Sequence, residues 1–514
     1  MNNNKIKTLG ELKKSGYVSK SIKQEIRDNL IKKIQAKENP FPGILGYEDS
    51  VIPDTERALL SQHNILFLGL RGQAKTRMAR QMTELLDEYI PIVTGSEIND
   101  DPFHPVSRFA IDTIEVNGDT TPIEWLHRSL RYGEKLATPD VSVADLIGDI
   151  DPIKAANLKL SFADERVLHY GIIPRSNRCI FVINELPDLQ ARIQVSLFNI
   201  LEEGDLQIRG FKLRLPLDVM FVFTANPEDY TNRGSIVTPL KDRIESQILT
   251  HYPKSIETAL EITEQEAAIN EAQQQRVKVS DLIKRLIEQV AFEARASELV
   301  DKKSGVSARL TISAYENAIS AAERRAIIND EKETQVWLSD LMGIIPSITG
   351  KIELVYEGEQ EGPYQVAFNL LERSIRTQFG QYFPNPDTLK KKRNKDTTPD
   401  DNPYKAITRW FDAGNSLNIF FETRDEDKVQ LLYKVDGLHA LVKKYFKSAN
   451  AQGSADENEN ALLMEFVLHG LAAHSMISKK VLEGKIEFKD LMGSMLNIGT
   501  EHFGEEDFNE DDFN

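Results

Sequence analysis

Three short runs of apolar residues lie in the first half of the chain, at residues 65–68, 179–183 and 219–224. Continuous apolar runs of this length are typical of strands whose two faces are both buried, as in a parallel sheet that helices cover. Polar residues stand at the carboxyl end of each run. In open α/β sheets the carboxyl ends of the strands line the ligand crevice. The pattern therefore predicts an α/β domain with a binding site along one edge of its sheet.

Helical spacing of apolar residues predicts further elements around these strands. Residues 76–86 and 189–202 are predicted to be helices, and 206–215 alternates as a hairpin. The segment between the first two strands is longer than a βα crossover needs, so it predicts an insert. Within this insert we predict a loop over 94–107, a strand over 109–116 and a short helix over 122–130.

From residue 254 onward the pattern is mostly helical, and a new helix begins at Arg309. A helical lid domain and a mostly helical C-terminal extension are therefore predicted to follow the α/β domain. The predicted divisions are an N-terminal helical segment at 1–40, the α/β domain at 41–253, the lid at 254–345, the extension at 346–446, a linker at 447–460, C-terminal helices at 461–500 and an acidic tail at 501–514.

Net charge, apolar runs and the cysteine count indicate which classes of protein the chain can belong to. The 514 residues include 63 Lys and Arg against 80 Asp and Glu, a net charge of −17, which argues against a protein that wraps nucleic acid. The chain has no apolar segment at its start and no uninterrupted run of 18 apolar residues, so we predict a cytoplasmic protein without a membrane segment. The one cysteine, Cys179, lies in an apolar run and is predicted to be a buried core thiol.

The stretch with the clearest chemistry follows the first apolar run. A glycine-containing loop between a strand and a helix cradles phosphates, because its backbone N–H groups and the positive end of the helix dipole converge on one anion site. The spacing matches the P-loop pattern, in which a lysine reaches the β- and γ-phosphates and the next hydroxyl holds Mg²⁺. The residues of this predicted loop are Gly69, Leu70, Arg71, Gly72, Gln73, Ala74, Lys75 and Thr76.

Ala74 departs from the P-loop pattern, which has a second glycine at this position. The extra methyl group matters if the backbone there needs a positive φ angle. The loop alone leaves an ordinary surface βα turn as an equal alternative, so the residues downstream decide the interpretation.

Taken together, residues 38–330 resemble the AAA+ ATPases, and within them the magnesium-chelatase I-subunit and MoxR-type branch. Besides the loop, the insert with Asp145-Leu146-Ile147-Gly148 resembles that of this branch, and four further stretches carry the resemblance. They are Ile183-Asn184-Glu185-Leu186 at the Walker B position, Thr224-Ala225-Asn226-Pro227 at the sensor-1 strand, Leu240-Lys241-Asp242-Arg243-Ile244, which is similar to the family's Leu-Leu-Asp-Arg-Phe, and Gly305-Val306-Ser307-Ala308-Arg309 at the sensor-2 helix.

The resemblance implies a role for each of these residues. Lys75 and the loop amides would hold the triphosphate of ATP, and Thr76 with Asn184 would hold Mg²⁺. The implied catalytic residues are Glu185, which would polarise the attacking water, Asn226, which would orient that water or sense the γ-phosphate, Arg309, which would reach over from the lid, and Arg243, which would be an arginine finger for the adjacent subunit. Each residue alone has an ordinary structural alternative, and only their joint order favours the functional interpretation.

Asn184 is the second departure from the family pattern, because the family's Walker B carries Asp-Glu and this chain has Asn184-Glu185. An amide oxygen is uncharged and binds Mg²⁺ more weakly than a carboxylate. The sequence therefore predicts an ATPase that binds ATP through Lys75 and the loop but hydrolyses it slowly. An aspartate restored at position 184 is expected to raise the affinity for Mg²⁺.

The resemblance also implies partners. An arginine finger makes sense only between subunits, so a homo-hexameric ring is implied. Proteins of this branch often act with a partner that carries a von Willebrand factor A domain. The predicted function is ATP-driven remodelling of a partner protein or metal insertion into it, and a MoxR-like chaperone role is at least as well supported as a chelatase role.

Two functions of other classes stay open. A sigma-54-type transcription activator has the same ATPase core, but it predicts a Gly-Ala-Phe-Thr-Gly-Ala loop and a basic helix-turn-helix that this sequence lacks. A regulatory ring subunit with little hydrolysis is compatible with Asn184 and Ala74. The acidic tail, with Phe503, Phe508 and Phe513, is predicted to be a solubilising segment or a docking peptide for a partner.

Overall fold

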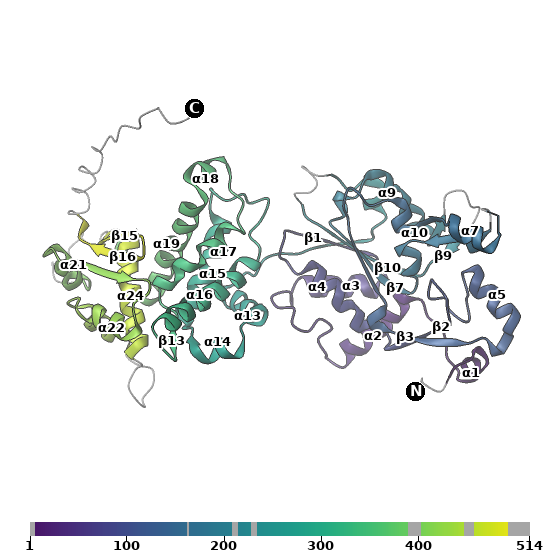
Figure 1. Ribbon diagram of the computed structural model, residues 1–514, viewed down its shortest axis with the longest axis horizontal. Coiled ribbons are helices and arrows are strands. Elements are labelled where there is room, and N and C mark those ends of the chain that lie inside the picture. Colours follow the sequence, from purple (N-terminus) through teal and green to yellow (C-terminus); the bar gives the residue numbers. More distant parts are fainter. Residues whose placement is uncertain are drawn as a thin grey trace, which may run out of the picture. The chain divides into compact units, whose positions relative to one another are not determined.

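The chain divides into two compact units, Met1–Tyr252 and Pro253–Asn514. The computed structural model (Figure 1) describes residues 6–161, 164–207, 214–227, 234–388, 402–446 and 457–491. The predicted acidic tail at 501–514 and residues 447–456 of the predicted linker therefore lie outside the described residues.

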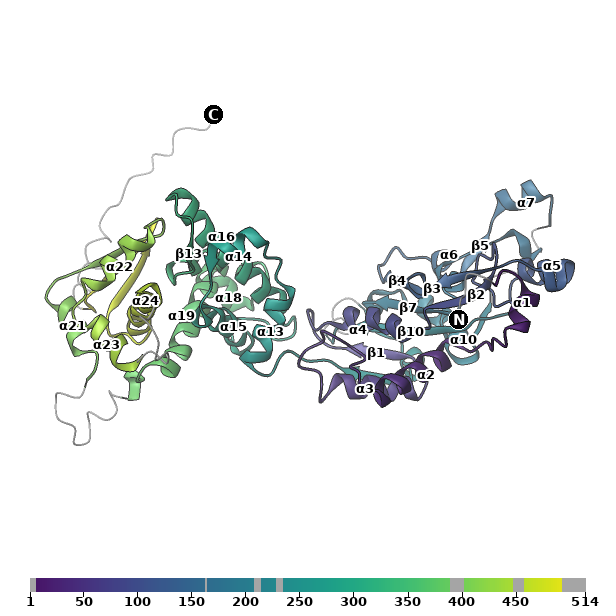
Figure 2. The same ribbon diagram turned by 90° about the horizontal axis from the view of Figure 1, so that it is seen from below.

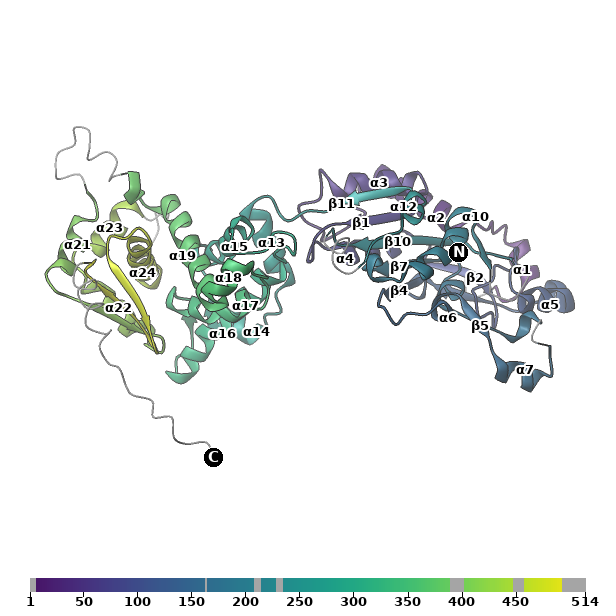
Figure 3. The same ribbon diagram turned by 90° about the horizontal axis from the view of Figure 1, so that it is seen from above.

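The first unit contains a five-stranded parallel sheet in the order β11-β1-β10-β7-β4 (Figure 3). All residues of β7 and β10 are buried. The three apolar runs seen in the sequence thus lie side by side in the middle of the sheet, and their carboxyl ends share one edge. The strands are β1 (Ile65–Leu68), β4 (Tyr132–Leu136), β7 (Cys179–Asn184), β10 (Val219–Ala225) and β11 (Ser246–Leu249).

Helices cover both faces of this sheet (Figure 1). In β1, Ile65 and Phe67 pack into one apolar cluster and Leu66 packs into the other, because side chains alternate along a strand. The predicted parallel sheet flanked by helices is confirmed. The first cluster takes in α2 (Ile22–Gln35), α3 (Val51–Leu60) and α4 (Lys75–Gln81), and the second takes in α9 (Ala191–Ser196), α10 (Phe198–Glu203) and α12 (Thr238–Asp242).

The N-terminal segment contains α1 (Leu9–Lys14) and α2. A buried ion pair fastens α2 to the edge of the sheet. The guanidinium of Arg131, which is 1% exposed, donates to both carboxylate oxygens of Glu25 over 2.7 and 2.8 Å. This pair fixes the position of α2, because either charge alone would be buried without a partner.

Two elements of the insert differ from the sequence prediction. The predicted strand over 109–116 is the helix α5 (Arg108–Asn117), and the predicted helix over 122–130 contains the strand β3 (Ile123–His127). The side chain of Ser107 caps α5 by accepting a hydrogen bond from the backbone N–H of Ala110 over 3.1 Å. β3 pairs antiparallel with β2 (Tyr89–Val93), and this pairing overrides the local pattern.

Other boundaries in the first unit shift by a few residues. The helix predicted over 76–86 ends at Gln81 and continues as a 3₁₀ helix, Met82–Leu85, and the helix predicted over 189–202 is two helices that meet at Leu197. In the predicted hairpin, β8 (Asp205–Gln207) pairs antiparallel with β9 (Arg214–Pro216), and 208–213 lie outside the described residues. The remaining short elements are α6 (Val143–Leu146), β5 (Gly148–Ile150), α7 (Pro152–Leu158), β6 (Leu168–Tyr170) and α8 (Ile172–Arg175).

The second unit is mostly helical, as predicted (Figure 2). The helix expected from Arg309 is α16, and one apolar cluster extends from Val277 to Phe488, on both sides of residue 345. In the described part of the chain, no helix is both long and apolar enough to cross a membrane. The helices are α13 (Ile256–Glu266), α14 (Glu271–Arg276), α15 (Asp281–Ala296), α16 (Arg309–Ile328), α17 (Ile345–Thr349), α18 (Tyr356–Glu361), α19 (Pro363–Tyr382), α21 (Lys405–Asp412), α22 (Asp425–Tyr433), α23 (Leu438–Tyr445) and α24 (Glu457–Ala473).

The segment predicted as C-terminal helices, 461–500, contains a hairpin as well as α24. β15 (Ser478–Leu482) and β16 (Lys485–Lys489) pair antiparallel, and β16 also pairs with β14 (Leu417–Phe420). The helix prediction is therefore wrong for these residues. Gly484, with φ of +78°, forms the tight turn, and alternate residues of β16 are buried, which is the period of a strand.

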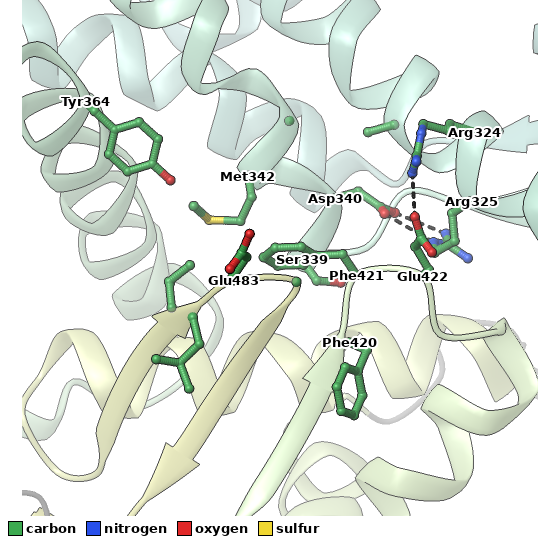
Figure 4. Close-up of a pocket in the computed structure, with 15 residues that line it drawn as sticks. Arg324, Arg325, Ser339, Asp340, Met342, Tyr364, Phe420, Phe421, Glu422 and Glu483 are labelled. Carbon is green, nitrogen blue, oxygen red and sulfur yellow. Dashed lines mark hydrogen bonds and ion pairs between the residues drawn. The ribbon is translucent and has the colours of Figure 1, made fainter.

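A cavity of about 850 Å³ lies within the second unit, where β14 and the β15–β16 turn face α16 (Figure 4). An ion pair between Arg324 and Glu422, 2.9 Å long, stands at its rim, and the buried Arg325 binds Asp340 behind it. None of the residues predicted to form the functional site lines this cavity. The cavity is thus not part of the predicted functional site.

Candidate functional site

The predicted phosphate-binding loop connects β1 to α4 and contains two residues with positive φ. Gly72 has φ of +73°, and Ala74 has φ of +53° and ψ of +16°, the left-handed conformation. Gly69 is required for a different reason, because a Cβ atom there would collide with the side chains of Thr250 and Gln73. The backbone therefore folds tightly, with Ala74 in a conformation that favours glycine.

Two tyrosine hydroxyls bind backbone carbonyl oxygens of the loop. The hydroxyl of Tyr252 donates to the carbonyl oxygen of Arg71 over 2.9 Å, and that of Tyr47 lies 2.9 Å from the carbonyl oxygen of Gln73. A trans peptide is planar, so its carbonyl and the next N–H point in opposite directions. The N–H group of Gly72 is therefore directed away from Tyr252, and that of Ala74 is directed away from Tyr47. Converging N–H groups form an anion site.

Lys75 begins α4 and lies inside this loop. Its side chain is buried, and its ammonium group donates to the carbonyl oxygens of Gly69 and, over 3.0 Å, Leu70. A buried ammonium adds positive charge to the loop. The loop amides, the N-terminus of α4 and this ammonium together fit a polyphosphate.

Asn184, the last residue of β7, connects three elements of the sheet edge. Its side-chain oxygen accepts hydrogen bonds from the hydroxyls of Thr76, over 3.3 Å, and Thr224, over 3.0 Å. Its side-chain nitrogen donates to a carboxylate oxygen of Glu134 over 2.6 Å. Thr76 belongs to α4, Thr224 to β10 and Glu134 to β4. The structure thus brings together Thr76 and Asn184, the two residues predicted to hold Mg²⁺.

Glu185 follows Asn184 directly and has a left-handed backbone, with φ of +54° and ψ of +49°. Its backbone N–H donates to the hydroxyl of Thr224 over 3.2 Å. A residue other than glycine in this conformation costs about 1–3 kcal/mol and persists only when its surroundings impose it. Glu185 is held half-buried at the sheet edge, directly beyond β7.

Asn226 follows β10 at the same edge. The N–H of Gly69 donates to the carbonyl oxygen of Ala225 over 3.1 Å, so Asn226 stands beside the start of the loop. Its side-chain oxygen is buried, and no group in the described part of the chain donates to it. A buried acceptor of this kind usually has a partner, and a water or phosphate-bound proton donor in the site would supply one.

The two predicted arginines belong to other elements of the chain. The guanidinium of Arg243 donates to a carboxylate oxygen of Glu202 over 2.7 Å and to the carbonyl oxygen of Pro239 over 2.8 Å, and it stacks on Phe198, 4.9 Å from the ring centre. Arg309 begins α16 in the second unit and is exposed. Arg243 is thus held on α10 and α12, and among the described residues it makes no hydrogen bond or ion pair to the loop.

Several residues at the site carry no recognisable sequence signal. Tyr47 and Tyr252 precede and follow the sheet in the chain, so only the fold brings them to the loop. Glu134 lies in the insert, whose strand β4 was not predicted. Its other carboxylate oxygen accepts from Arg80 over 2.9 Å and from Tyr132 over 3.0 Å. Burial and the hydrogen bond to Glu134 raise the pKa of Tyr132, which keeps this hydroxyl a donor.

The donor set fits a hydrated magnesium ion bound together with phosphates. A hydroxyl and an amide oxygen meet beside the loop, and Mg²⁺ normally keeps several waters and binds few protein ligands when phosphates supply the rest. Within the described residues no group of three or more His, Cys, Asp or Glu side chains could form a metal cage.

A comparison with models of known protein families found a match to part of the chain. Residues 126–244 match the family model described as AAA domain (dynein-related subfamily). This part of the chain is thus similar to an AAA domain. The matched residues begin after the phosphate-binding loop and include Asn184, Glu185, Asn226 and Arg243. A search of curated proteins found no match.

Solved structures that are similar to this chain include the following three. A putative ATPase from Cytophaga hutchinsonii is 17% identical over 68% of this chain and 95% of that chain, with a TM-score of 0.29. A chain of the complex between BchI and BchD of magnesium chelatase is 19% identical over 62% of this chain and 98% of that chain, with a TM-score of 0.32. NtrX from Brucella abortus is 13% identical over 71% of this chain and 69% of that chain, with a TM-score of 0.36. At such TM-scores these similarities contribute nothing to the assignment of function.

The left-handed backbone of Ala74 generates a prediction about stability. Ala74→Gly removes the conformational cost of the methyl group, and we expect the free energy of unfolding to rise by about 0.5–1 kcal/mol, measured by urea denaturation. The matched control is Ala79→Gly in the helical part of α4, which should lower stability by about 1 kcal/mol or more. A loss of stability in Ala74→Gly would show that the loop does not hold residue 74 at positive φ.

Proposed function

We propose that this AAA+ protein binds ATP with Mg²⁺ at the edge formed by β1, β10 and β7, and hydrolyses it. The observation that supports this most strongly is the hydrogen bond between Thr76 and Asn184. It joins the helix that follows the phosphate-binding loop to the end of the strand in the Walker B position. The residues implied for the phosphates, the metal and the water thus belong to neighbouring strand ends.

Each residue has a role that follows from its position. The N–H groups of Gly72 and Ala74 and the ammonium of Lys75 would bind the phosphates, and the oxygens of Thr76 and Asn184 would bind Mg²⁺. When bound, Mg²⁺ would neutralise charge that develops on the phosphate oxygens.

Two residues would act on the attacking water. Glu185 would accept its proton, and Asn226, whose buried oxygen has no donor in the described part of the chain, would orient it. Positioning and electrostatic stabilisation are what phosphoryl transfer requires of a protein.

Slow hydrolysis is part of the proposal. Asn184 gives the metal an uncharged ligand where an aspartate would give a charged one, so less of the developing charge is balanced at the site. ATP binding depends on the loop amides and Lys75 and should be retained. A regulatory subunit that binds but scarcely hydrolyses ATP is the second candidate, and Asn184 is the observation that favours it. Among the residues that the structure describes, no feature favours a transcription activator.

The physiological setting follows from the family resemblance. We propose a protein of the magnesium-chelatase and MoxR-type branch that forms a hexameric ring and remodels, or inserts metal into, a partner protein. Arg243 would act on the nucleotide of the adjacent subunit, and its contacts with Glu202, Pro239 and Phe198 would hold it for that role. Arg309, on the lid, would contact the nucleotide of its own chain. A partner with a von Willebrand factor A domain is part of this proposal.

The proposed chemistry predicts the effect of replacing the catalytic acid. Glu185→Gln should lower steady-state phosphate release by about 100-fold or more, because it removes the proton acceptor. The same variant should bind ATP like the wild type. Lys75→Ala defines the background, since it removes the phosphate-binding ammonium. Wild-type turnover that does not exceed this background, with or without partner protein, would leave a nucleotide-binding scaffold as the function.

The ring predicts a complementation experiment. Arg243→Ala should lower turnover on the order of 10³-fold, as the loss of an arginine finger does, without weakening ATP binding. Lys75→Ala subunits still carry Arg243, so an equal mixture of the two inactive variants should regain turnover when they assemble together. Arg57→Ala, a surface change on α3, is the control.

Assembly is measured in the same samples by light scattering before and after ATP addition. A larger particle is expected with ATP. Full activity of Arg243→Ala alone, or a mixture that stays inactive although the larger particle forms, would contradict a finger supplied by the neighbouring subunit.

A further inference from the structure

Glu134 is a carboxylate at the candidate metal site that no motif assigns. It lies on β4, the strand next to β7, with Leu136 of β4 paired to Asn184. Residues two apart in a strand point to the same face, so Glu134 stands on the same side as Leu136. One of its oxygens accepts from the side-chain nitrogen of Asn184 over 2.6 Å. A charge-assisted hydrogen bond of this kind is stronger than a neutral one.

Glu134 is itself fixed by donors from two elements. Its second oxygen accepts from both Nε and a terminal nitrogen of Arg80, over 3.1 and 2.9 Å, and from the hydroxyl of Tyr132 over 3.0 Å. Arg80 belongs to α4, the helix that begins with Lys75 and Thr76. One carboxylate thus connects β4, β7 and the helix of the phosphate-binding loop.

This arrangement determines which end of the Asn184 amide faces the site. The hydroxyls of Thr76 and Thr224 can either donate or accept, so they select neither end. A carboxylate only accepts. If the amide were turned over, its oxygen would face the Glu134 oxygen at 2.6 Å, with no proton between them. Glu134 therefore keeps the amide nitrogen on its own side and the amide oxygen on the side of Thr76.

We propose that Glu134 is a positioning residue for the nucleotide-bound metal: it holds the oxygen of Asn184 toward the metal position. This inference rests on the proposed function of the site. The negative charge that the family carries in the Walker B aspartate then lies one strand away in this chain, on Glu134. The amide transmits its effect, since polarisation by the carboxylate makes the amide oxygen a better ligand.

The proposal changes the expectation for aspartate at position 184. Asn184→Asp alone would place its carboxylate against that of Glu134, where the amide nitrogen now donates. Like charges at this distance repel, so the new carboxylate would be displaced or would bind the metal poorly. Asn184→Asp should raise the affinity for Mg²⁺ only when combined with Glu134→Gln, whose amide can donate to the new carboxylate.

The test measures how much Mg²⁺ tightens nucleotide binding. The probe is the fluorescent, non-hydrolysed analogue mant-AMPPNP, titrated into the full-length protein in EDTA and in excess Mg²⁺. Glu134→Gln should lower the gain from Mg²⁺ by about tenfold, with binding in EDTA unchanged. The double variant Glu134→Gln with Asn184→Asp should recover at least the wild-type gain. The matched control is Glu124→Gln, an exposed glutamate on β3, which should change nothing.

The possible outcomes separate the role of Glu134 from the proposed function of the site. A normal Mg²⁺ gain in Glu134→Gln, or a gain in Asn184→Asp alone that equals that of the double variant, would overturn the role of Glu134 and leave the ATPase proposal intact. A wild type that binds no analogue would overturn the proposed function and this inference together. Recovery in the double variant supports positioning, because a merely structural loss at Glu134 would persist there.

Discussion

The hydrogen bonds of the Asn184 side chain are the interaction on which the candidate site depends. They join Thr76 of the loop helix, Thr224 of β10 and Glu134 of β4 at one point of the sheet edge. The side chain is 8% exposed, so these bonds are made in a largely dry environment, where an unsatisfied amide would be costly. A change in any partner therefore alters the position of the group that we assign to the metal.

The parallel sheet makes this convergence possible. β1, β10 and β7 are adjacent and run in the same direction, so the residues that follow them must meet. The site also contains two residues in left-handed backbone conformations, Ala74 and Glu185. Such residues concentrate at functional sites because the surrounding structure holds them there for a purpose other than stability. One lies in the loop after β1 and the other directly follows β7, the two strands on either side of β10, as a nucleotide site at this edge would require.

The sequence was sufficient to predict the centre of the sheet and the residues that follow its strands. Buried strands such as β7 and β10 are apolar throughout, and the loop between β1 and α4 has a distinctive spacing, so local patterns were informative there. The insert was harder to predict. Phe109, Ile111 and Val116 are residue types that favour a strand, but the cap at Ser107 favours a helix, and the segment is helical.

Contacts between distant parts of the chain could not be predicted from local patterns. Glu134 is 50 residues from Asn184, and Tyr252 is 181 residues from Arg71. Each pair forms only because strand order places the segments together. The C-terminal hairpin is a different case, since the alternation in β16 and the glycine before it, Gly484, are local signals of a strand pair.

The central claim is that the loop containing Lys75 binds an adenine nucleotide, and calorimetry tests it most directly. A non-hydrolysed ATP analogue is titrated with Mg²⁺ into the wild type and into Lys75→Ala. The account predicts saturable binding by the wild type and affinity lower by about tenfold or more in the variant, since a charged hydrogen-bond donor to phosphate is lost. No heat of binding in the wild type, or equal affinity in the two proteins, would contradict it.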